Sequence, residues 1–239
     1  TVTVTTAGCS ATSASTSVNV NPAPSALVTA SGPTSFCQGG SVSFTANAGN
    51  GYTYLWSNGE TTSSITSSIT GNFTVTVSNQ IGCSTTSAVN AVVVNPIPVA
   101  TITAGGSTTI CSGSPVSLSA PAGSNYLWNT GSTSQSINAA TAGNYTVVVT
   151  SAAGCSATSA PTTIMVNALP SAAISSSGST TFCQGATISL STTGGLSSYL
   201  WSTGETTSSL NVTTSGNYTV TVTNSNGCSA TSSPTVVNV

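Results

Sequence analysis

The chain has 239 residues and no Lys, Arg or His, and its only acidic residues are Glu60 and Glu205, so its net charge is −2 at pH 7. Globular proteins are on average about 25% charged. A surface without cationic side chains cannot displace counterions from nucleic acid. General acid–base catalysis draws on His, Asp, Glu or Lys, and two isolated glutamates do not form a catalytic pair. The composition therefore argues against a nucleic-acid-binding protein and against an enzyme.

A repeat of about 73 residues organises the sequence. Each repeat contains a Phe-Cys or Ile-Cys motif, then a Tyr-Leu-Trp motif and then a Gly-Cys-Ser motif. The Gly-Cys cysteine follows the tryptophan by 27 residues in every repeat, and the next Phe-Cys or Ile-Cys cysteine follows 28 residues later. Because the spacing across the junctions does not vary, we expect defined packing between modules rather than flexible tethers.

Residues 1–20 come first, and they contain Gly-Cys-Ser-Ala-Thr-Ser at 8–13, which fits the pattern Gly-Cys-Ser-x-Thr-Ser that closes every later repeat. We therefore expect them to be the last strands of a truncated module. Three modules are then predicted at 21–95, 96–167 and 168–239. Each junction carries Val-Asn followed by a proline within three residues. Proline removes a backbone donor and ends strand pairing, which favours module boundaries at these points.

Within each repeat, apolar and polar residues alternate, which indicates half-buried strands. In the first repeat Val42, Phe44 and Ala46 alternate with polar residues, and so do Val75 and Val77. Clusters of Gly, Asn and Ser separate such segments at intervals of about 8–12 residues. Several short strands in so small a unit predict an immunoglobulin-like sandwich. The predicted fold class is all-β: a tandem, head-to-tail array of small Ig-like β-sandwich modules.

The strands of the first repeat can be assigned in chain order. The segment that ends at Cys37 is predicted to be strand A with its turn into strand B. The remaining predicted strands are B at 42–46, C at 54–56, a short D or E strand at 61–65, F at 72–77 and G at 83–94.

Aromatic residues mark the predicted cores. The strand-C tryptophans are expected to be core residues: Trp56, Trp128 and Trp201. Tyr145 and Tyr218 follow a Gly-Asn turn at the start of strand F, which is the place of a tyrosine corner, where the hydroxyl bonds nearby backbone. Phe73 takes this place in the first repeat, where it can pack but cannot make that bond.

The motifs FCQGGSVSF, YLWSNGETTSSI and SGNYTVTVTNSNGCSATSS, which recur in order, resemble the immunoglobulin-like and PKD-like repeats of Bacteroidota cell-surface proteins. The resemblance covers nearly the whole chain. It implies a protein exported by the type IX secretion system that serves as a non-enzymatic cell-surface adhesin or fibre. It supplies no catalytic residue and no cofactor. The near-absence of charge departs from the family pattern, so no calcium-dependent role is carried over.

The seven cysteines are disulfide candidates rather than metal ligands or nucleophiles, because there is no C-x-x-C motif and no histidine. They are Cys9, Cys37, Cys83, Cys111, Cys155, Cys183 and Cys228. One scheme stays within a module and pairs Cys37–Cys83, Cys111–Cys155 and Cys183–Cys228, with Cys9 left over. The other scheme joins neighbouring modules and pairs Cys37–Cys155 and Cys111–Cys228, with partners for Cys9, Cys83 and Cys183 outside the sequence.

Geometry favours the second scheme. In an Ig-type sandwich the A–B and F–G turns lie at opposite ends, roughly 25–40 Å apart for strands of this length, whereas a disulfide needs Cα atoms within about 7 Å. The first scheme stays open if strand A folds back along the sandwich.

These observations predict a structural segment of a long extracellular fibre or adhesin stalk. Its expected partners are neighbouring modules and identical chains, with no nucleic acid, no cofactor and no membrane insertion. The alternative is a glycan- or surface-binding adhesin module, ice binding included, that acts through Ser-, Thr- and Asn-rich faces. Thr219, Thr221 and Thr223 form one such ladder of hydroxyls, although the ordinary interpretation is the outer face of a strand.

Overall fold

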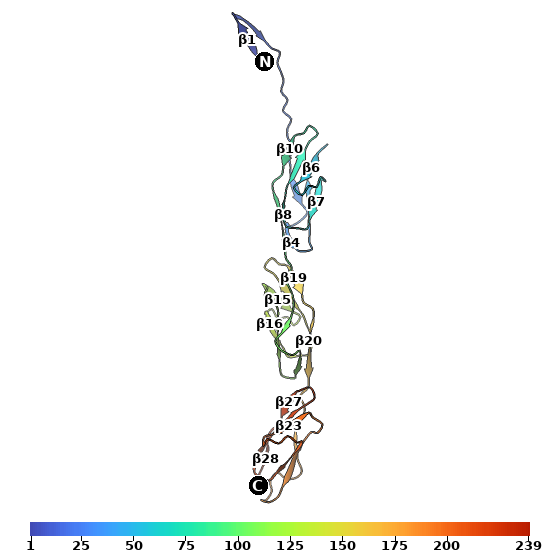
Figure 1. The fold of residues 1–239 in the computed structure, drawn as a ribbon, viewed down its shortest axis with the longest axis vertical. Coiled ribbons are helices and arrows are strands. Elements are labelled where there is room, and N and C mark those ends of the chain that lie inside the picture. Colours follow the sequence, from blue (N-terminus) through green and yellow to red (C-terminus); the bar gives the residue numbers. More distant parts are fainter. The chain divides into compact units, whose positions relative to one another are not determined.

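The computed structural model describes all 239 residues, which form 28 short β-strands and no helix (Figure 1). The predicted all-β fold class is confirmed. The chain divides into two compact units, residues 1–97 with 153–155, and residues 98–152 with 156–239. The module boundaries given above stay predictions.

The first strands form a hairpin. Strand β1 (Thr3–Thr6) pairs antiparallel with β2 (Cys9–Thr12). Ala7 and Gly8 make the two-residue turn with φ values of 47° and 83°, as a type I′ hairpin turn requires. Every residue from 1 to 20 is exposed, so this hairpin packs on no core.

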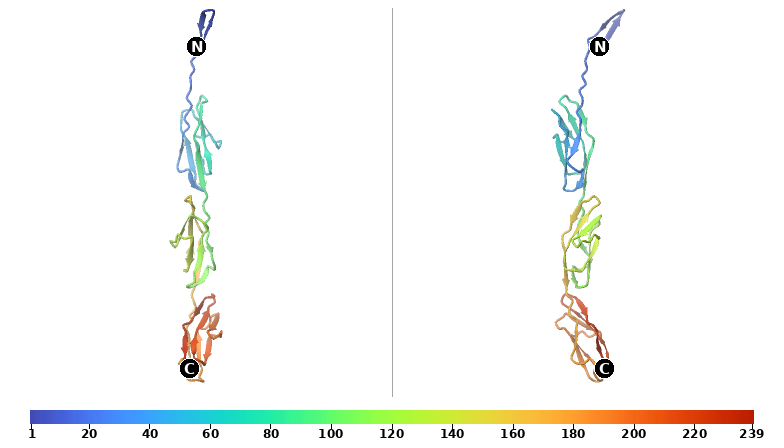
Figure 2. Two further views of the ribbon diagram at one scale, coloured as in Figure 1. Left: turned by 90° about the vertical axis from the view of Figure 1, so that its left-hand side faces the viewer. Right: turned by 180° about the vertical axis from the view of Figure 1, so that it is seen from behind.

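Nine strands make up what we call the first sandwich. They are β3 (Val28–Ala30), β4 (Ser35–Cys37), β5 (Val42–Ala46), β6 (Thr53–Trp56), β7 (Ser64–Ser67), β8 (Gly71–Phe73), β9 (Val75–Ser78), β10 (Ser84–Thr86) and β11 (Asn90–Asn95). One layer has the order β3-β5-β7, and the other combines β10-β9-β6 with β4-β11-β8. Figure 2 shows these strands from two further sides. All pairs are antiparallel except β4 with β11.

This order is that of an Ig-like sandwich. Strands β3, β5 and β7 are its strands A, B and E, and they face β4 (strand A′), β10 and β11 (strand G), β8 and β9 (strand F) and β6 (strand C). The predicted strands B and C lie where the sequence placed them, whereas predicted strand F is divided into β8 and β9 and predicted strand G into β10 and β11. Predicted strand A is two strands, β3 and β4, because Gly32 and Pro33 interrupt it, and proline has no N–H for a ladder. The short strand predicted at 61–65 begins only at Ser64 and runs to Ser67.

The second and third sandwiches repeat this order. The second contains β12 (Thr103–Ala104), β13 (Thr109–Cys111), β14 (Val116–Ser119), β15 (Asn125–Trp128), β16 (Ser136–Ala139), β17 (Gly143–Tyr145), β18 (Val147–Thr150), β19 (Ser156–Thr158) and β20 (Thr162–Asn167). The third contains β21 (Ile174–Ser176), β22 (Ile188–Thr192), β23 (Ser198–Trp201), β24 (Ser209–Val212), β25 (Gly216–Tyr218), β26 (Val220–Thr223), β27 (Ser229–Thr231) and β28 (Thr235–Val237). In the third sandwich a single parallel bridge, Thr181 to Asn238, replaces the pairing that β13 makes with β20.

Alternate residues of the central strands fill one core in each sandwich. In β5, Val42, Phe44 and Ala46 are buried, and Phe44 lies opposite Ile65 of β7. Burial of each large apolar side chain contributes roughly 1.5–3 kcal/mol. The first core consists of Val42, Phe44, Ala46, Trp56, Ile65, Phe73, Val75, Val77 and Val92, and equivalent residues form the other two. Each sandwich therefore has a core of its own.

Candidate functional site

Two disulfides are the chemically distinctive feature of the structure. They join Cys37 to Cys155 and Cys111 to Cys228, with 5.6 Å between the Cα atoms of each pair. Each bond connects the end of the A′ strand of one sandwich to the F–G loop of the next one along the chain, so the pairing follows the neighbour-joining scheme. We call each bond, with the junction residues beside it, a joint. Each lies within one compact unit.

Strand pairing positions the cysteine on the A′ side of the Cys111 joint. Cys111 ends β13, which pairs in parallel with β20 so that Cys111 lies opposite Asn167. The Ser112 backbone N–H donates to the Asn167 carbonyl at 2.9 Å, and the Ser114 N–H donates to the Cys111 carbonyl at 3.0 Å. Gly113 permits this turn because its φ is 86°, where a side chain is strained. The sulfur atom of Cys111 is thus held at the junction between the sandwiches.

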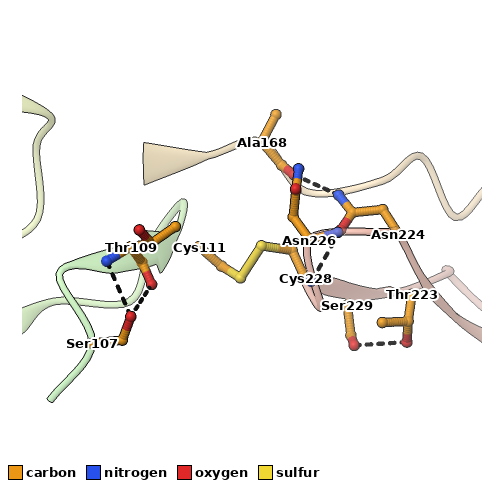
Figure 3. The surroundings of a disulfide bond; sticks show 9 residues. All are labelled: Ser107, Thr109, Cys111, Ala168, Thr223, Asn224, Asn226, Cys228 and Ser229. Carbon is orange, nitrogen blue, oxygen red and sulfur yellow. Dashed lines mark hydrogen bonds between the residues drawn. A yellow bond between two sulfur atoms is a disulfide. The ribbon is translucent and has the colours of Figure 1, made fainter. Parts of the chain in front are cut away.

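Asn224 organises the F–G loop on the other side of the Cys111 joint (Figure 3). Its Oδ1 atom accepts hydrogen bonds from the backbone N–H groups of Asn226 and Cys228, both at 3.0 Å. Its Nδ2 group donates to the carbonyl of Ala168 in the junction at 3.0 Å. One side chain therefore fixes the loop that carries Cys228 and also ties this loop to the chain entering the sandwich. Cys228 itself is fully buried.

The Cys37 joint has the same plan. Cys37 of β4 lies opposite Asn95 of β11, and the Gln38 backbone N–H donates to the Asn95 carbonyl at 2.8 Å. The Cys155 Sγ atom lies 3.9 Å from the same carbonyl oxygen, and Cys155 is 1% exposed. Ser151 takes the place that Asn224 has in the third sandwich. The two joints therefore share their strand register and their buried loop cysteine.

A third loop of this kind lies beside residues 19–21. The Asn79 Oδ1 atom accepts from the backbone N–H groups of Cys83 at 2.9 Å and Ile81 at 3.2 Å, and its Nδ2 group donates to the Pro22 carbonyl at 3.3 Å. The Cys83 Sγ atom lies 3.8 Å from the Asn21 carbonyl oxygen. Cys83 is nevertheless a free thiol, and so are the exposed Cys9 and Cys183.

The tryptophans predicted as core residues lie at the centre of each core. Trp56, Trp128 and Trp201 are at most 2% exposed. Each indole Nε1–H donates at 2.8 Å to the backbone carbonyl six residues later, which belongs to Thr62, Ser134 or Thr207. Sequence reasoning missed this bond, because a backbone acceptor leaves no mark on the residue type. The indole therefore packs the core and also holds the turn after strand C.

The aromatic residues at the start of strand F are also buried. The Tyr145 hydroxyl donates to the Thr141 carbonyl at 2.9 Å, and the Tyr218 hydroxyl donates to the Thr214 carbonyl at 2.9 Å. Phe73 is 6% exposed and lies 5.8 Å from the ring of Phe44, centroid to centroid. The hydroxyl bonds of Tyr145 and Tyr218 are those of a tyrosine corner.

Replacing Tyr145 with phenylalanine is expected to lower the free energy of unfolding by about 0.5–1.5 kcal/mol for each hydrogen bond lost, because it removes the bonds of the hydroxyl to the Thr141 carbonyl and to the Thr141 hydroxyl and keeps the ring. Urea denaturation followed by circular dichroism measures this loss. Thr141→Ser is the matched control, since it keeps the hydroxyl that lies 2.9 Å from the Tyr145 hydroxyl. Equal stability of Tyr145→Phe and the parent protein would show that the hydroxyl does not stabilise the corner.

The two glutamates belong to exposed turns. The Glu60 carboxylate accepts a hydrogen bond from Asn58, and the Glu205 carboxylate accepts one from the Thr203 hydroxyl. No group of three or more His, Cys, Asp or Glu side chains is arranged to hold a metal ion. The structure also has no helix that is long and apolar enough to cross a membrane.

Two hydroxyls of the predicted ladder, those of Thr221 and Thr223, bond to hydroxyls of the neighbouring strand. Thr221 of β26 lies 2.8 Å from Thr231 of β27, oxygen to oxygen, and Thr223 lies 2.9 Å from Ser229. Thr76 and Thr86 make the same pair in the first sandwich at 3.0 Å. These bonds run between neighbouring strands of one sheet, so they stabilise the sheet and take up part of the bonding capacity of the hydroxyls.

Known protein families and curated proteins offer no match to this sequence. Solved structures with similar folds include a Bacteroides ovatus mixed-linkage glucan utilization locus protein, SGBP-B, in complex with a heptasaccharide, at 17% identity and a TM-score of 0.24. That match covers 86% of this chain and 65% of the other. The murine CEACAM1b structure matches 60% of this chain and 100% of its own at 14% identity and a TM-score of 0.35.

The ICAM-5 D1–D4 ectodomain fragment matches 89% of this chain and 76% of its own, at 10% identity and a TM-score of 0.45. Because these identities and TM-scores are low, the assignment of the Ig-like fold rests on the strand order of the sheets and on the parallel pairing of β4 with β11.

Proposed function

We propose that this chain is a structural segment of an extracellular fibre or adhesin stalk, in which disulfides lock successive Ig-like sandwiches to one another. The observation that carries the proposal is the pairing itself: both bonds connect different sandwiches, and neither closes a loop within one. A bond inside a module stabilises that module alone, whereas a bond between modules holds two neighbouring sandwiches together. The proposed role is therefore mechanical.

The environment of the protein follows from the same bonds. Disulfides persist in oxidising compartments, above all outside the cell. The motif resemblance to Bacteroidota surface repeats supports export by the type IX system and a place at the cell surface. Neighbouring modules and identical chains are the partners we propose. A surface with only two charged side chains leaves little electrostatic repulsion between copies, which favours lateral assembly.

Force spectroscopy on single molecules held at both termini tests the mechanical role. Once unfolded, the reduced chain extends along its whole length, at about 3.5 Å per residue. In the oxidised chain the shortest covalent path crosses from Cys37 to Cys155, runs back to Cys111 and crosses again to Cys228. We therefore expect the oxidised protein to reach well under half of the reduced extension. If the oxidised and the reduced protein reach the same extension, the proposal is wrong.

One observation favours the alternative, an adhesin face that binds glycans or a solid surface. A leucine at the same position of strand C is about half exposed in every sandwich: Leu55, Leu127 and Leu200. In the first sandwich Leu55 lies opposite Thr76, so an apolar group stands beside the hydroxyl pairs of the same sheet. Saturable binding of the protein to a glycan array or to ice, lost in the Leu→Ser variants, would support this function, and no binding would exclude it.

A further inference from the structure

We infer that residues 19–21 and Cys83 form an open joint, which accepts an extended Ser/Thr-Phe/Ile-Cys strand from a further module of the same repeat. The strand adds in parallel to residues 19–21, and its cysteine bonds to Cys83. The inference rests on the proposed function and adds the site, the register and the chemistry of the partner.

The two closed joints supply the template. In the Cys37 joint, β4 pairs in parallel with Val93, Val94 and Asn95. In the Cys111 joint, β13 pairs in the same way with residues 165–167. In each case the cysteine lies opposite the junction asparagine, and the residue after the cysteine donates its N–H to the carbonyl of that asparagine.

The loop that carries Cys83 already has the geometry of the loops in the two closed joints. The Cys83 Sγ atom lies 3.8 Å from the Asn21 carbonyl oxygen, and in the Cys37 joint the Cys155 Sγ atom lies 3.9 Å from the Asn95 carbonyl oxygen. Asn79 ties its loop to the junction through the Pro22 carbonyl, as Asn224 does through Ala168. Cys83 therefore occupies the position of a loop cysteine that is bonded in both other joints.

The strand half of the open joint is an unpaired edge. Residues 13–27 belong to no strand, although residues 19–21 correspond to Val93, Val94 and Asn95 in the repeat. Val18 and Val20 are both 84% exposed, whereas Val92, the counterpart of Val18, is 1% exposed. Unpaired N–H and C=O groups beside exposed apolar side chains are a template for strand addition. The edge therefore fits an A′ strand and its sandwich.

The other free thiols do not combine these features. Cys183 belongs to the strand side of a joint, and its segment is already paired, because Phe182 donates its N–H to the Asn238 carbonyl at 3.0 Å. Cys9 begins β2, directly after the hairpin turn. Closure of the open joint oxidises two thiols to one disulfide. A small-molecule disulfide such as oxidised glutathione takes up the two electrons and two protons and leaves as two thiols.

The test uses a peptide with the sequence of residues 33–40, whose cysteine is activated as a mixed disulfide with a thiopyridyl group. The Cys83 thiolate attacks the peptide sulfur, a new S–S bond forms, and the thiopyridyl thiolate departs with the electron pair. Mass spectrometry of the intact protein and of its peptides gives the rate at each free cysteine. A scrambled peptide of identical composition, activated in the same way, is the control.

We expect the native sequence to modify Cys83 at least about tenfold faster than the scrambled peptide, a difference of about 1.4 kcal/mol, and we expect equal rates for the two peptides at Cys9 and Cys183. Asn19→Pro should abolish the preference, because the equivalent Val93 and Met165 donate their N–H groups to Thr34 and Thr108. Ser17→Pro, outside the edge, should keep it.

Equal rates for both peptides at Cys83, or an unchanged preference in Asn19→Pro, would overturn the inference. Reactivity of Cys83 toward iodoacetamide shows that the thiol is accessible in each variant. The Cys37–Cys155 and Cys111–Cys228 bonds are mapped in the same sample. If both are present and the peptide shows no preference, the open joint fails and the structural role stands. If both are absent, the proposed function fails as well.

Discussion

Replacing Trp56 with alanine is expected to lower the free energy of unfolding of the first sandwich by about 3–5 kcal/mol. The side chain is 1% exposed and is the largest in its core. The substitution leaves a cavity and also removes the donor that bonds the Thr62 carbonyl at 2.8 Å. Hydrogen exchange resolved by peptide mass spectrometry measures the effect, because amides of β5 and β9 should lose protection while those of the third sandwich keep it.

Leu55→Ala is the matched control for Trp56→Ala. Leu55 precedes Trp56 on the same strand but points outward, with 55% of its surface exposed. Its removal should change the stability by no more than about 0.5 kcal/mol. Trp56→Phe should lie between the two, because it keeps much of the packing and loses the hydrogen bond. Similar losses for Trp56→Ala and Leu55→Ala would contradict a core role for the tryptophan.

The double variant Cys111→Ser with Cys228→Ser is expected to lose about 2–5 kcal/mol of stability in the second compact unit. The bond closes a separation of 117 residues, and cross-links across long separations restrict the unfolded chain most. Both cysteines are replaced so that no new thiol remains. Urea denaturation without reductant, followed by circular dichroism, measures the loss.

Cys183→Ser serves as the control for the double variant, because Cys183 is exposed and free. It should unfold like the parent protein. Under reducing conditions the parent protein should also approach the stability of the double variant. A double variant as stable as the oxidised parent protein would mean that the Cys111 joint does not stabilise the unit.

The sequence predicts the sandwich architecture well because the pattern is carried by side chains that alternate. Val42, Phe44 and Ala46 are buried in β5 as their spacing indicates, and the strand-C tryptophans lie in the cores. A short strand with one buried face has only one register that hides its apolar residues. Repetition of the same motifs in three sandwiches strengthens each assignment.

The division of predicted strands F and G into shorter strands could not be predicted, because it depends on local hydrogen bonds of serine side chains. Strand F is broken at Thr74, whose backbone N–H is 3.2 Å from the Ser57 hydroxyl. Strand G is broken after Thr86, where the Ser87 hydroxyl accepts the N–H of Val75 at 3.1 Å. Such a serine uses its hydroxyl to accept a backbone N–H that a carbonyl of the paired strand would otherwise accept. In the sequence it looks the same as a serine that faces solvent.

The joints were partly visible in the sequence. The spacing of the cysteines allowed two pairing schemes, and the separation of the turns in an Ig-type sandwich favoured the one that the structure contains. The organising role of Asn79 and Asn224 was missed, although both stand four residues before the loop cysteine. Their bonds to the junction depend on where the preceding chain runs, which no local pattern records.

Fragment analysis without reduction tests the neighbour-joining pairing most directly. Free thiols are first alkylated. Cyanogen bromide then cleaves after Met165, the only methionine, and a glutamate-specific protease cleaves after Glu60 and Glu205. The four fragments are residues 1–60, 61–165, 166–205 and 206–239.

The structure predicts that three fragments stay linked, because Cys37–Cys155 joins 1–60 to 61–165 and Cys111–Cys228 joins 61–165 to 206–239. The fragment 166–205 should separate with Cys183 alkylated. Pairing within modules would instead leave 166–205 bound to 206–239 and separate from the other two. That second pattern of masses would contradict the neighbour-joining pairing.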